Sequence, residues 1–473
     1  MIVTEEQDFT QVRFEQAFSP HEVNKAKEVL ENRLRDVDYE VRFDNRNTTA
    51  FGNFALVEAF KRTVGFSDMI TGEFDKPKGR NSVYSSEELL EFLVDANILG
   101  VSRFSHSEIL QKDPGYHKIK GITRYPDERT LRRMLSELDP VHVEQIVNIN
   151  RRLLEAKSLT EQPRYVWLDI DDTVITLFGD QGGGHVGYNP RYRGRPSYSS
   201  RVAFLGGSDE IVHLGLCPGS ARGTEGFQEF FMDTERALPE KWVVRGVRFD
   251  AGFSSDTTFS FLEDRQLLYA CKIRKTQRLQ KAIKYLDRMN LWHKLDEDHH
   301  VAELRLPLSG WKKERRFVFI REEYDRKTGQ KVVRGLKHQV ICTNLEDAPR
   351  NVWHFYNQRC TVENRIDELK DGFAMDQQSQ RTLFQNRAYA LIKVIAYNLL
   401  NWMKTAIMPG EVKTYRARTL RRRIFCIPGN VVDSGKYIRL AANRWLESVI
   451  LRIKHKLDAF LYIIAAHLWP QGA

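Results

Sequence analysis

The feature that most constrains the fold is a change of sequence pattern at Tyr165. Three runs that are apolar or alternate in polarity follow, separated by Gly and Pro residues: YVWLDID, PSYSSRVAFLG and EIVHLGLC. We expect three consecutive strands here. A helix near residues 226–238, the strand WVVRGVRFD, a helix near residues 255–264 and the strand LLYACKI come next. The predicted order of elements is therefore βββαβαβ, which is an α/β arrangement.

The segment before Tyr165 has a helical pattern. Residues 1 to about 160 are expected to be mainly helical, with capping boxes at Ser85–Glu88 and Ser105–Glu108 and a further helix from Pro126. Short successive helices with basic residues are typical of a helix-turn-helix DNA-binding unit, and equally of an ordinary helical bundle. The sequence leaves both interpretations open.

The segment after the predicted α/β region mixes strands and helices. We expect a β-rich tract at residues 301–343, two strong helices at about 350–373 and 384–404, and a basic region from residue 411 with a helix near residues 441–455. The β-rich tract separates the last strand of the βββαβαβ pattern from the strong helices.

Basic residues are concentrated in three tracts. The chain has 73 Lys and Arg against 63 Asp and Glu, a formal charge of +10. Residues 271–288 carry seven bases against one acid, residues 411–460 carry twelve bases against four acids, and WKKERR occupies residues 311–316. Residues 1–40 are acidic instead. Such basic tracts suit a polyphosphate partner such as DNA, although a solvated helix face explains any single tract.

Composition excludes several classes of protein. The chain has 41% hydrophobic and 11% aromatic residues, so we expect a globular protein with a sizeable core. No apolar run reaches the roughly 20 residues of a membrane span, and the N-terminus lacks the pattern of a signal peptide. The five cysteines are scattered without a C-x-x-C pair. We expect a cytoplasmic protein with reduced cysteines.

Charged residues line one side of the predicted helix at residues 350–373. At about 100° per residue, with Tyr356 at zero, Arg359 falls at about −60°, Glu363 at about −20° and Lys370 at about −40°. This stripe borders the apolar face, which suits a cleft that holds an anion; an ordinary amphipathic helix with an Arg–Glu pair is the simpler explanation. Asp367, at about +20°, stays open as the working carboxylate.

Further carboxylates lie on or after the predicted strands. Strand alternation places Trp167, Asp169 and Asp171 on one face, and WVVRGVRFD runs into Asp250 and a glycine turn. Such acids are often turn-formers. Two strand carboxylates and one helix carboxylate are also what a two-metal phosphoryl-transfer site needs, because oxygen ligands hold two Mg²⁺ ions about 4 Å apart.

Four segments together resemble a known family. They occur in the family's order: LDIDDTVITLFGDQGGG with GYNPRYRGRPSY, then CPGS, then VRFDAGF, then the Y-x2-R-x3-E-x6-K signature that begins at Tyr356. The sequence resembles the DDE transposases of bacterial insertion sequences, specifically transposase DDE domain group 1. It departs from the family's usual R-P-G-N run at CPGS, and from its usual Ser at Ala251. These departures leave the acids intact.

The resemblance implies a fold and its divisions. It implies an α/β ribonuclease H-like catalytic core, βββαβαβα, at residues 161–290 and 345–405, with a β-rich insertion at residues 291–344. The flanking regions would be a helical N-terminal region at residues 1–160 for binding DNA ends and a basic C-terminal region at residues 406–473. Trp311 in the insertion is the candidate for stacking on a base, against the alternative that it packs on its own domain.

The resemblance also implies site residues. The catalytic and metal-binding carboxylates would be Asp171, Asp250 and Glu363, and Asp169 either shares the role of Asp171 or supports it. The residues that contact the DNA end would be Tyr356, Arg359 and Lys370. Two Mg²⁺ ions are the expected cofactor, and Mn²⁺ can substitute.

The function implied is cut-and-paste DNA transposition. The protein would cleave terminal inverted repeats, join the ends to target DNA, and act as a homodimer on DNA in the bacterial cytoplasm, associated with the nucleoid. One alternative is a catalytically inactive DNA-binding protein derived from a transposase. Another is a haloacid-dehalogenase-like phosphatase, because DIDDTV matches its D-x-D-x-T motif with Asp169 as nucleophile and Asp171 as acid/base.

Overall fold

The computed structural model describes residues 19–34, 47–76, 82–328, 331–433 and 438–468. The chain divides into two units, residues 1–46 and 47–473. The described part of the first unit is helix α2 (Pro20–Leu34). Apart from residues 19–34, the acidic tract predicted for residues 1–40 lies outside the described residues.

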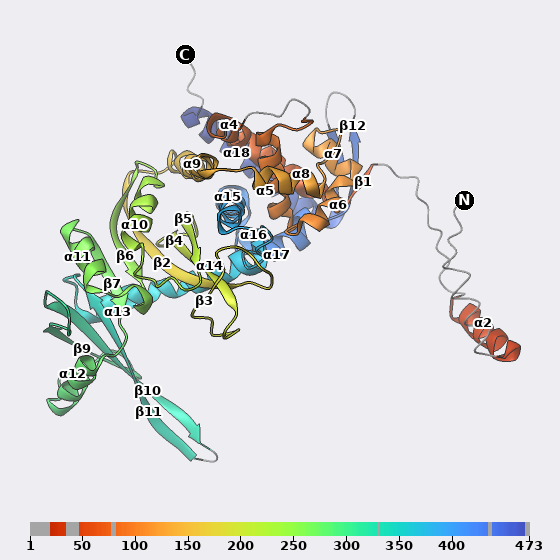
Figure 1. Ribbon diagram of the computed structural model, residues 1–473. Helices are drawn as coiled ribbons and strands as arrows, with labels where there is room; N and C mark the ends of the chain where they lie inside the picture. The colour runs from red at the N-terminus through yellow and green to blue at the C-terminus, as the bar shows by residue number, and fades with distance from the viewer. Residues whose placement is uncertain (1–18, 35–46, 77–81, 329–330, 434–437, 469–473) are drawn as a thin grey trace. The chain divides into compact units, whose positions relative to one another are not determined.

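A large mixed sheet is the main feature of the second unit (Figure 1). Its ten strands follow the order β3-β4-β2-β6-β7-β11-β10-β9-β8, and β5 pairs with β4. The strand bounds are β2 (Arg164–Thr176), β3 (His185–Val186), β4 (Pro196–Leu205), β5 (Ile211–Pro218), β6 (Trp242–Phe249), β7 (Leu268–Lys272), β8 (His293–Lys294), β9 (His299–Leu306), β10 (Arg315–Thr328) and β11 (Lys331–Thr343). Together with its helices, the sheet confirms the predicted α/β class.

The strand directions follow from the connections. Strand β2 is antiparallel to β4, and β4 is antiparallel to β5. Helices α10 (Phe227–Arg236) and α11 (Asp256–Asp264) then lead to β6 and β7, which run parallel to β2. Parallel neighbours need such crossover connections, whereas antiparallel neighbours are joined by short loops. The order of strands and helices in this region is the predicted one, except that the two-residue strand β3 lies between β2 and β4.

The predicted β-rich tract continues the same sheet. Strand β11 pairs antiparallel with β7, with Cys342 opposite Cys271, and β10 and β9 follow. Helix α12 (Gln277–Arg288) precedes these strands. In β10, Phe317 and Phe319 pack into one apolar cluster, and Val318 and Ile320 into another. Both faces of β10 are therefore covered there, which explains its continuous apolar run.

The N-terminal part of the second unit is helical. Its elements are η1 (Gly52–Phe54), α3 (Ala55–Thr63), α4 (Phe66–Glu73), α5 (Ser86–Leu99), η2 (Phe104–Ser107), α6 (Glu108–Gln111), α7 (Pro114–Lys120), α8 (Glu128–Ser136) and α9 (Pro140–Ser158). The capping box at Ser85 and Glu88 is confirmed. The one at Ser105 is wrong, because Ser105 lies inside a 3-10 turn and α6 begins only at Glu108.

Helix α15 (Leu383–Ile407) joins these helices to the sheet (Figure 1). It is buried along most of its length and packs against α5, α9, β5 and α18 (Glu447–Leu468). One apolar core thus includes side chains from residues 51–156 and from residues 362–464. The other face of the sheet is covered by α10, α11 and α12.

The C-terminal part contains short elements before α18. These are α16 (Gly410–Lys413), α17 (Ala417–Leu420), the π-turn η6 (Arg421–Phe425), β12 (Gly429–Asp433), β13 (Ile438–Ala441) and η7 (Arg444–Leu446). Strands β12 and β13 form a small sheet with β1 (Thr48–Thr49). The helix predicted near residues 441–455 is therefore wrong at its start, because strand pairing takes residues 438–441 and α18 begins at Glu447.

The segment predicted as one helix at residues 350–373 is broken into four pieces. They are α13 (Pro349–Asn357), the 3-10 turn η4 (Gln358–Cys360), α14 (Thr361–Asp367) and the π-turn η5 (Glu368–Gly372). We call residues 349–372 the signature segment. The prediction of a continuous α-helix is wrong, because the helix type changes along the segment. Each change shifts the side chains from the directions that an ideal α-helix gives them.

Two expectations from composition can be checked in the described residues. All five cysteines are free thiols. No described helix combines the length and apolar character that crossing a lipid bilayer requires.

Candidate active site

Two aspartates from neighbouring parallel strands lie side by side. Strands β2 and β6 pair in parallel with Ile170 opposite Phe249, so the next residues, Asp171 and Asp250, are adjacent. The Asp250 carboxylate also accepts a 2.8 Å hydrogen bond from the N–H of Gly252. Burial, together with the charge of Asp250, raises the pKa of Asp171 to about 6. The site therefore holds more negative charge than its surroundings neutralise.

A buried arginine from the signature segment meets this pair. The Nη2 atom of Arg359 lies 2.9 Å from Oδ1 of Asp171 and donates to the Ile170 carbonyl at 3.4 Å. Burial works against the charged guanidinium, but Asp171, Tyr356 and Asp250 raise the pKa of Arg359 overall. The side chain is 7% exposed, and its Nε has no hydrogen-bond partner within the described residues. Arg359 therefore has a spare donor beside the aspartates.

Two more signature residues adjoin the same edge of β2. Tyr356 is buried, and burial raises the pKa of its hydroxyl, which also senses the charges of Arg359 and Asp171. The Nζ atom of Lys370 donates to the carbonyl of Val174 at 3.2 Å, and burial lowers its pKa. The structure thus brings these residues together with the two aspartates and Arg359.

Glu363 differs from these residues in its exposure. Its side chain is exposed on α14, and among the described residues the oxygens of Asp171, Asp250 and Glu363 do not all come within 4.8 Å of one another. The 3-10 turn η4 lies between Arg359 and Glu363, and the π-turn η5 begins before Lys370. The ideal period of 100° per residue, from which the stripe was predicted, therefore does not hold along this segment.

The other two aspartates of DIDDT are held by arginines. Asp169 is fully buried, and its two oxygens accept hydrogen bonds from Arg248 at 2.7 and 2.9 Å. Asp172 pairs with Arg201 at 3.0 Å, its cross-strand neighbour on β4. Sequence reasoning missed both arginines, although Arg248 precedes Asp250 by two residues. Asp169, Asp171 and Asp172 thus differ in their closest ion pair. That of Asp171 is with Arg359 of the signature segment, whereas those of the other two are with arginines on strands.

The two acids that follow Glu363 along the chain differ in their contacts. Glu368 accepts a 2.9 Å hydrogen bond from the backbone N–H of Ala417, which occupies its carboxylate in a structural contact. Asp367 is exposed at the end of α14. Asp367 therefore stays an alternative to Glu363 as the third carboxylate, whereas Glu368 does not.

Trp311 packs on its own part of the fold. Its ring lies 5.4 Å from that of Phe259 and 5.9 Å from that of Phe317, and the guanidinium of Arg315 lies 5.1 Å from it. Its half-exposed part lines a cleft of 630 Å³. Basic side chains line this cleft as well: Arg274, Arg278 and Lys281. Trp311 therefore packs on its own domain, and part of its ring stays open to a basic cleft.

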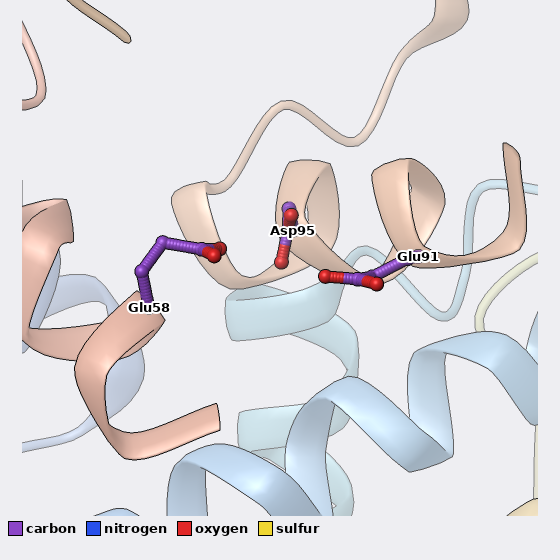
Figure 2. A group of neighbouring side chains, drawn as sticks. All are labelled: Glu58, Glu91 and Asp95. Carbon is purple, nitrogen blue, oxygen red and sulfur yellow. The ribbon is translucent and has the colours of Figure 1, made fainter. Parts of the chain in front are cut away.

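A second group of carboxylates has closer spacing. Figure 2 shows Glu58 on α3, and Glu91 and Asp95 on α5, facing one another. One oxygen from each lies within 4.8 Å of the others, and no other such trio of potential ligands occurs among the described residues. Judged by spacing alone, this is the better metal site.

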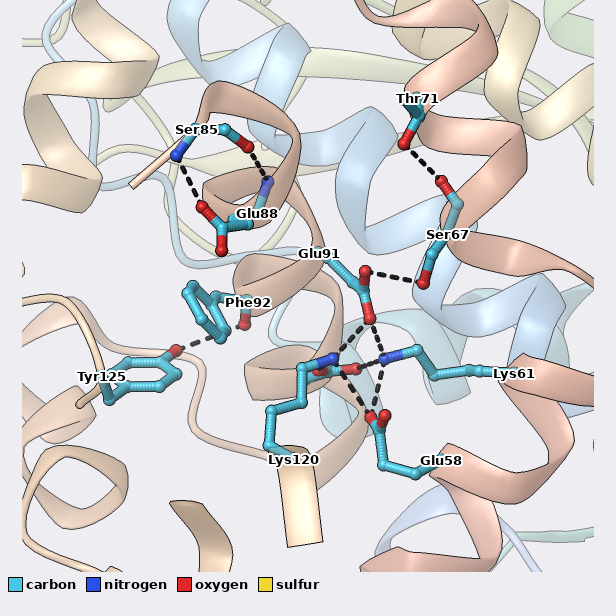
Figure 3. Close-up of polar contacts among 11 residues, drawn as sticks. Glu58, Lys61, Ser67, Thr71, Ser85, Glu88, Glu91, Phe92, Lys120 and Tyr125 are labelled. Atoms are coloured by element: carbon cyan, nitrogen blue, oxygen red, sulfur yellow. Dashed lines mark hydrogen bonds and ion pairs between the residues drawn. The ribbon is translucent and has the colours of Figure 1, made fainter. Parts of the chain in front are cut away.

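Two lysines already occupy this group (Figure 3). The Lys61 ammonium lies 2.6–2.8 Å from an oxygen of each of the three carboxylates. The Lys120 ammonium lies 3.2 Å from Glu58 and 2.8 Å from Asp95, and also contacts Glu91. We call these five residues the lysine–carboxylate cluster. Because the protein supplies its own cations here, the cluster ties α3, α5 and α7 together and is not a metal centre.

One comparison with known proteins identifies a family. The model of a family described as transposase DDE domain group 1 matches residues 32–457. No curated protein matches the sequence. Among solved structures, the cryo-EM structure of a piggyBac transposase synaptic complex with hairpin DNA is similar, with 11% identity, coverage of 88% of this chain and 86% of that chain, and a TM-score of 0.40. A likeness at this score carries no argument here.

Proposed function

The chain belongs to the transposase DDE domain group 1 family, and from this premise we propose that it cleaves the terminal inverted repeats of a mobile element and joins the freed ends to target DNA. The observation that carries the proposal is the placement of Asp171 and Asp250 at adjacent strand positions, with Arg359 of the signature segment paired with Asp171.

The strand arrangement supports a ribonuclease H-like catalytic core. The order β5-β4-β2-β6-β7, with three antiparallel strands followed by two parallel ones, is the arrangement expected of that core. We assign the core to residues 161–290 and 345–405, the insertion to residues 291–344, end binding to residues 1–160, and a basic C-terminal region to residues 406–473. The insertion strands extend the core sheet instead of forming a separate one.

The carboxylates fit a divalent cation by their chemistry. Carboxylate oxygens are the ligands that Mg²⁺ prefers, and the excess negative charge at Asp171 and Asp250 favours a bound cation. Asp171, Asp250 and Glu363 would hold two Mg²⁺ ions, for which Mn²⁺ can substitute. When bound, the ions stabilise the charge that develops on the phosphate during in-line displacement.

The basic signature residues would position the DNA. Arg359 is paired with Asp171 through its Nη2, and its guanidinium would contribute positive charge beside the scissile phosphate. Lys370 and Tyr356 adjoin the same edge of β2 and would contact the DNA end. Because two ends must be held at once, we propose a homodimer on the DNA, acting in the bacterial cytoplasm at the nucleoid.

The phosphatase alternative meets a physical obstacle. It requires Asp169 to be an accessible nucleophile, but Asp169 is fully buried and both of its oxygens accept hydrogen bonds from Arg248. A carboxylate in this position cannot reach a substrate. The inactive DNA-binding derivative stays the main alternative to the transposase.

Substitution of the third carboxylate tests the proposal. Glu363→Gln removes one charge at nearly constant volume, and we expect it to abolish Mg²⁺-dependent cleavage of a plasmid that carries the DNA flanking the gene, with end binding retained. Asp367→Asn is the matched control, one helical turn away on the same exposed surface, and should cleave normally. Cleavage by Glu363→Gln together with loss in Asp367→Asn would transfer the role to Asp367. No cleavage by the unaltered protein, despite specific end binding, would favour the inactive derivative.

A further inference from the structure

A cleft rich in arginine lies on the C-terminal side of the signature segment. It has a volume of 360 Å³ and is formed by α17 and η6, and we call it the arginine cleft. Its lining residues are Arg418, Thr419, Arg422 and Arg423. The three arginines are exposed, and within the described residues none of them forms an ion pair with a carboxylate. Three guanidinium groups therefore face one cleft without neutralisation.

The arginines of the cleft repel one another electrostatically when no anion is bound. Arg418 and Arg422 are four residues apart, and like charges at that spacing on a helical surface repel each other. Arg423 is held in place because its Nη1 donates to the hydroxyl of Tyr415 at 3.2 Å and its guanidinium lies 5.5 Å from that ring. An anion in the cleft would relieve the repulsion. Phosphate is a good match, because guanidinium forks donate two parallel hydrogen bonds to its oxygens.

The backbone under the cleft is tied to the signature segment. Arg421, in the same π-turn, points inward and donates to the carbonyls of Gly372 and, at 2.7 Å, Asn97. The N–H of Ala417 donates to Glu368. On the outer surface, Arg416 Nη2 lies 3.4 Å from Oδ1 of Asn364, the residue after Glu363. The arginine cleft thus has a fixed position beside the segment that carries Glu363 and Lys370.

We infer that the arginine cleft binds the phosphate backbone of duplex DNA. This inference extends the proposed function, because it adds a DNA contact outside the signature residues and outside the cleft at Trp311. Side chains that contact only phosphates carry no base information, so the contact is independent of sequence and positions the duplex relative to the signature segment.

Salt dependence of DNA binding tests the inference. The triple variant Arg418→Gln, Arg422→Gln and Arg423→Gln should bind duplex DNA roughly 10- to 100-fold more weakly at 0.1 M NaCl, and the slope of log K against log [NaCl] should become shallower by about 2–3, since each phosphate contact contributes about 0.9. Fluorescence anisotropy with an end duplex and with an unrelated duplex measures both quantities.

Two further variants control for net charge and fold. Lys112→Gln, Arg236→Gln and Arg265→Gln together remove the same charge from exposed residues that already have carboxylate partners. This control should keep the slope of the unaltered protein. Replacing the three cleft arginines with Lys should restore most of the slope, and circular dichroism should be the same for all variants.

The outcomes separate the inference from the proposed function. An equal slope in the cleft and control variants overturns the inference, as does a loss confined to the end duplex, which would indicate base readout. A shallower slope on both duplexes supports it. If the cleft variant has the shallower slope but the unaltered protein never cleaves DNA, the proposed catalysis fails and the DNA contact stands. If the unaltered protein cleaves DNA but the cleft variant keeps its slope, the proposed catalysis stands and the DNA contact fails.

Discussion

The lysine–carboxylate cluster and the aspartate pair at β2 and β6 are two acidic regions with opposite neutralisation. The cluster has three carboxylates within 4.8 Å and two lysines among them. The aspartate pair has one arginine, and the carboxylate proposed to join it is exposed on another element. Spacing alone favours the cluster as a metal site. Because Lys61 and Lys120 already pair with these carboxylates, the aspartate pair is the better candidate for a metal site.

The difference also appears in the protonation of the acids. Burial favours the neutral form of Glu91, yet the charges of Lys61 and Lys120 lower its pKa to about 2. At Asp171, burial dominates over the single charge of Arg359, and the pKa rises to about 6. Asp95, the fully buried carboxylate of the cluster, has a raised pKa although both lysines contact it, because burial outweighs their charges. The pKa of each acid thus reflects burial as well as the cations beside it.

The largest expected effect is on catalysis at the aspartate pair. Asp250→Asn should reduce plasmid cleavage by at least about 10³-fold, since a metal site contributes several kcal/mol of transition-state stabilisation. Stability should not fall, because the substitution removes repulsion with Asp171 and Asn can still accept the hydrogen bond from Gly252. Cleavage assays and urea unfolding check both statements. A loss of stability above about 2 kcal/mol would make Asp250 a structural residue instead.

A large effect on stability is expected at the lysine–carboxylate cluster. Lys61→Met leaves two buried carboxylates and the partly buried Glu91 with one lysine, and breaking a buried ion pair costs about 3–5 kcal/mol. Urea unfolding should show this loss, whereas Lys112→Met at an exposed pair should change stability by less than about 0.5 kcal/mol. Recovery of the lost stability on adding Mg²⁺ would contradict the comparison, because it would show that the cluster can hold a metal.

The smallest effect is a difference in pH dependence between the two regions. Glu91 has a pKa lowered from 4.5 to about 2, so its contribution to stability is present above pH 4.5 and is lost as the pH falls towards 2. Asp171 has a pKa raised from 3.8 to about 6, so the folded state takes up its proton first and gains stability as the pH falls from 6 to 4.

Urea unfolding in EDTA across pH 3–8 separates these contributions. Asp171→Asn should lack the gain between pH 6 and 4, and Glu91→Gln should lack the loss at lower pH. The same gain in Asp171→Asn as in the unaltered protein would mean that another group titrates in that range.

The sequence predicted the elements better than the contacts. Alternation in YVWLDID and the strand end at Asp250 were enough to expect both aspartates at the sheet, because strand periodicity is local. The partner of Asp171 was not predictable, since Arg359 is 188 positions away along the chain. The breaks in the signature segment were not predictable, because the 3-10 and π turns are set by contacts with distant parts of the chain and not by the local apolar period. Ser105 shows the same limit, as a capping pattern inside a 3-10 turn.

The position of α15 in the core has a consequence for synthesis on the ribosome. Helices α5 and α9 pack against α15, which ends about 250 residues after α9. At about 5–20 residues per second, the ribosome needs roughly 12–50 s to make that intervening chain. During this time α5 and α9 can pack on α4 and α8, but their contacts with α15 are missing. This part of the core is therefore completed only after α15 has been made.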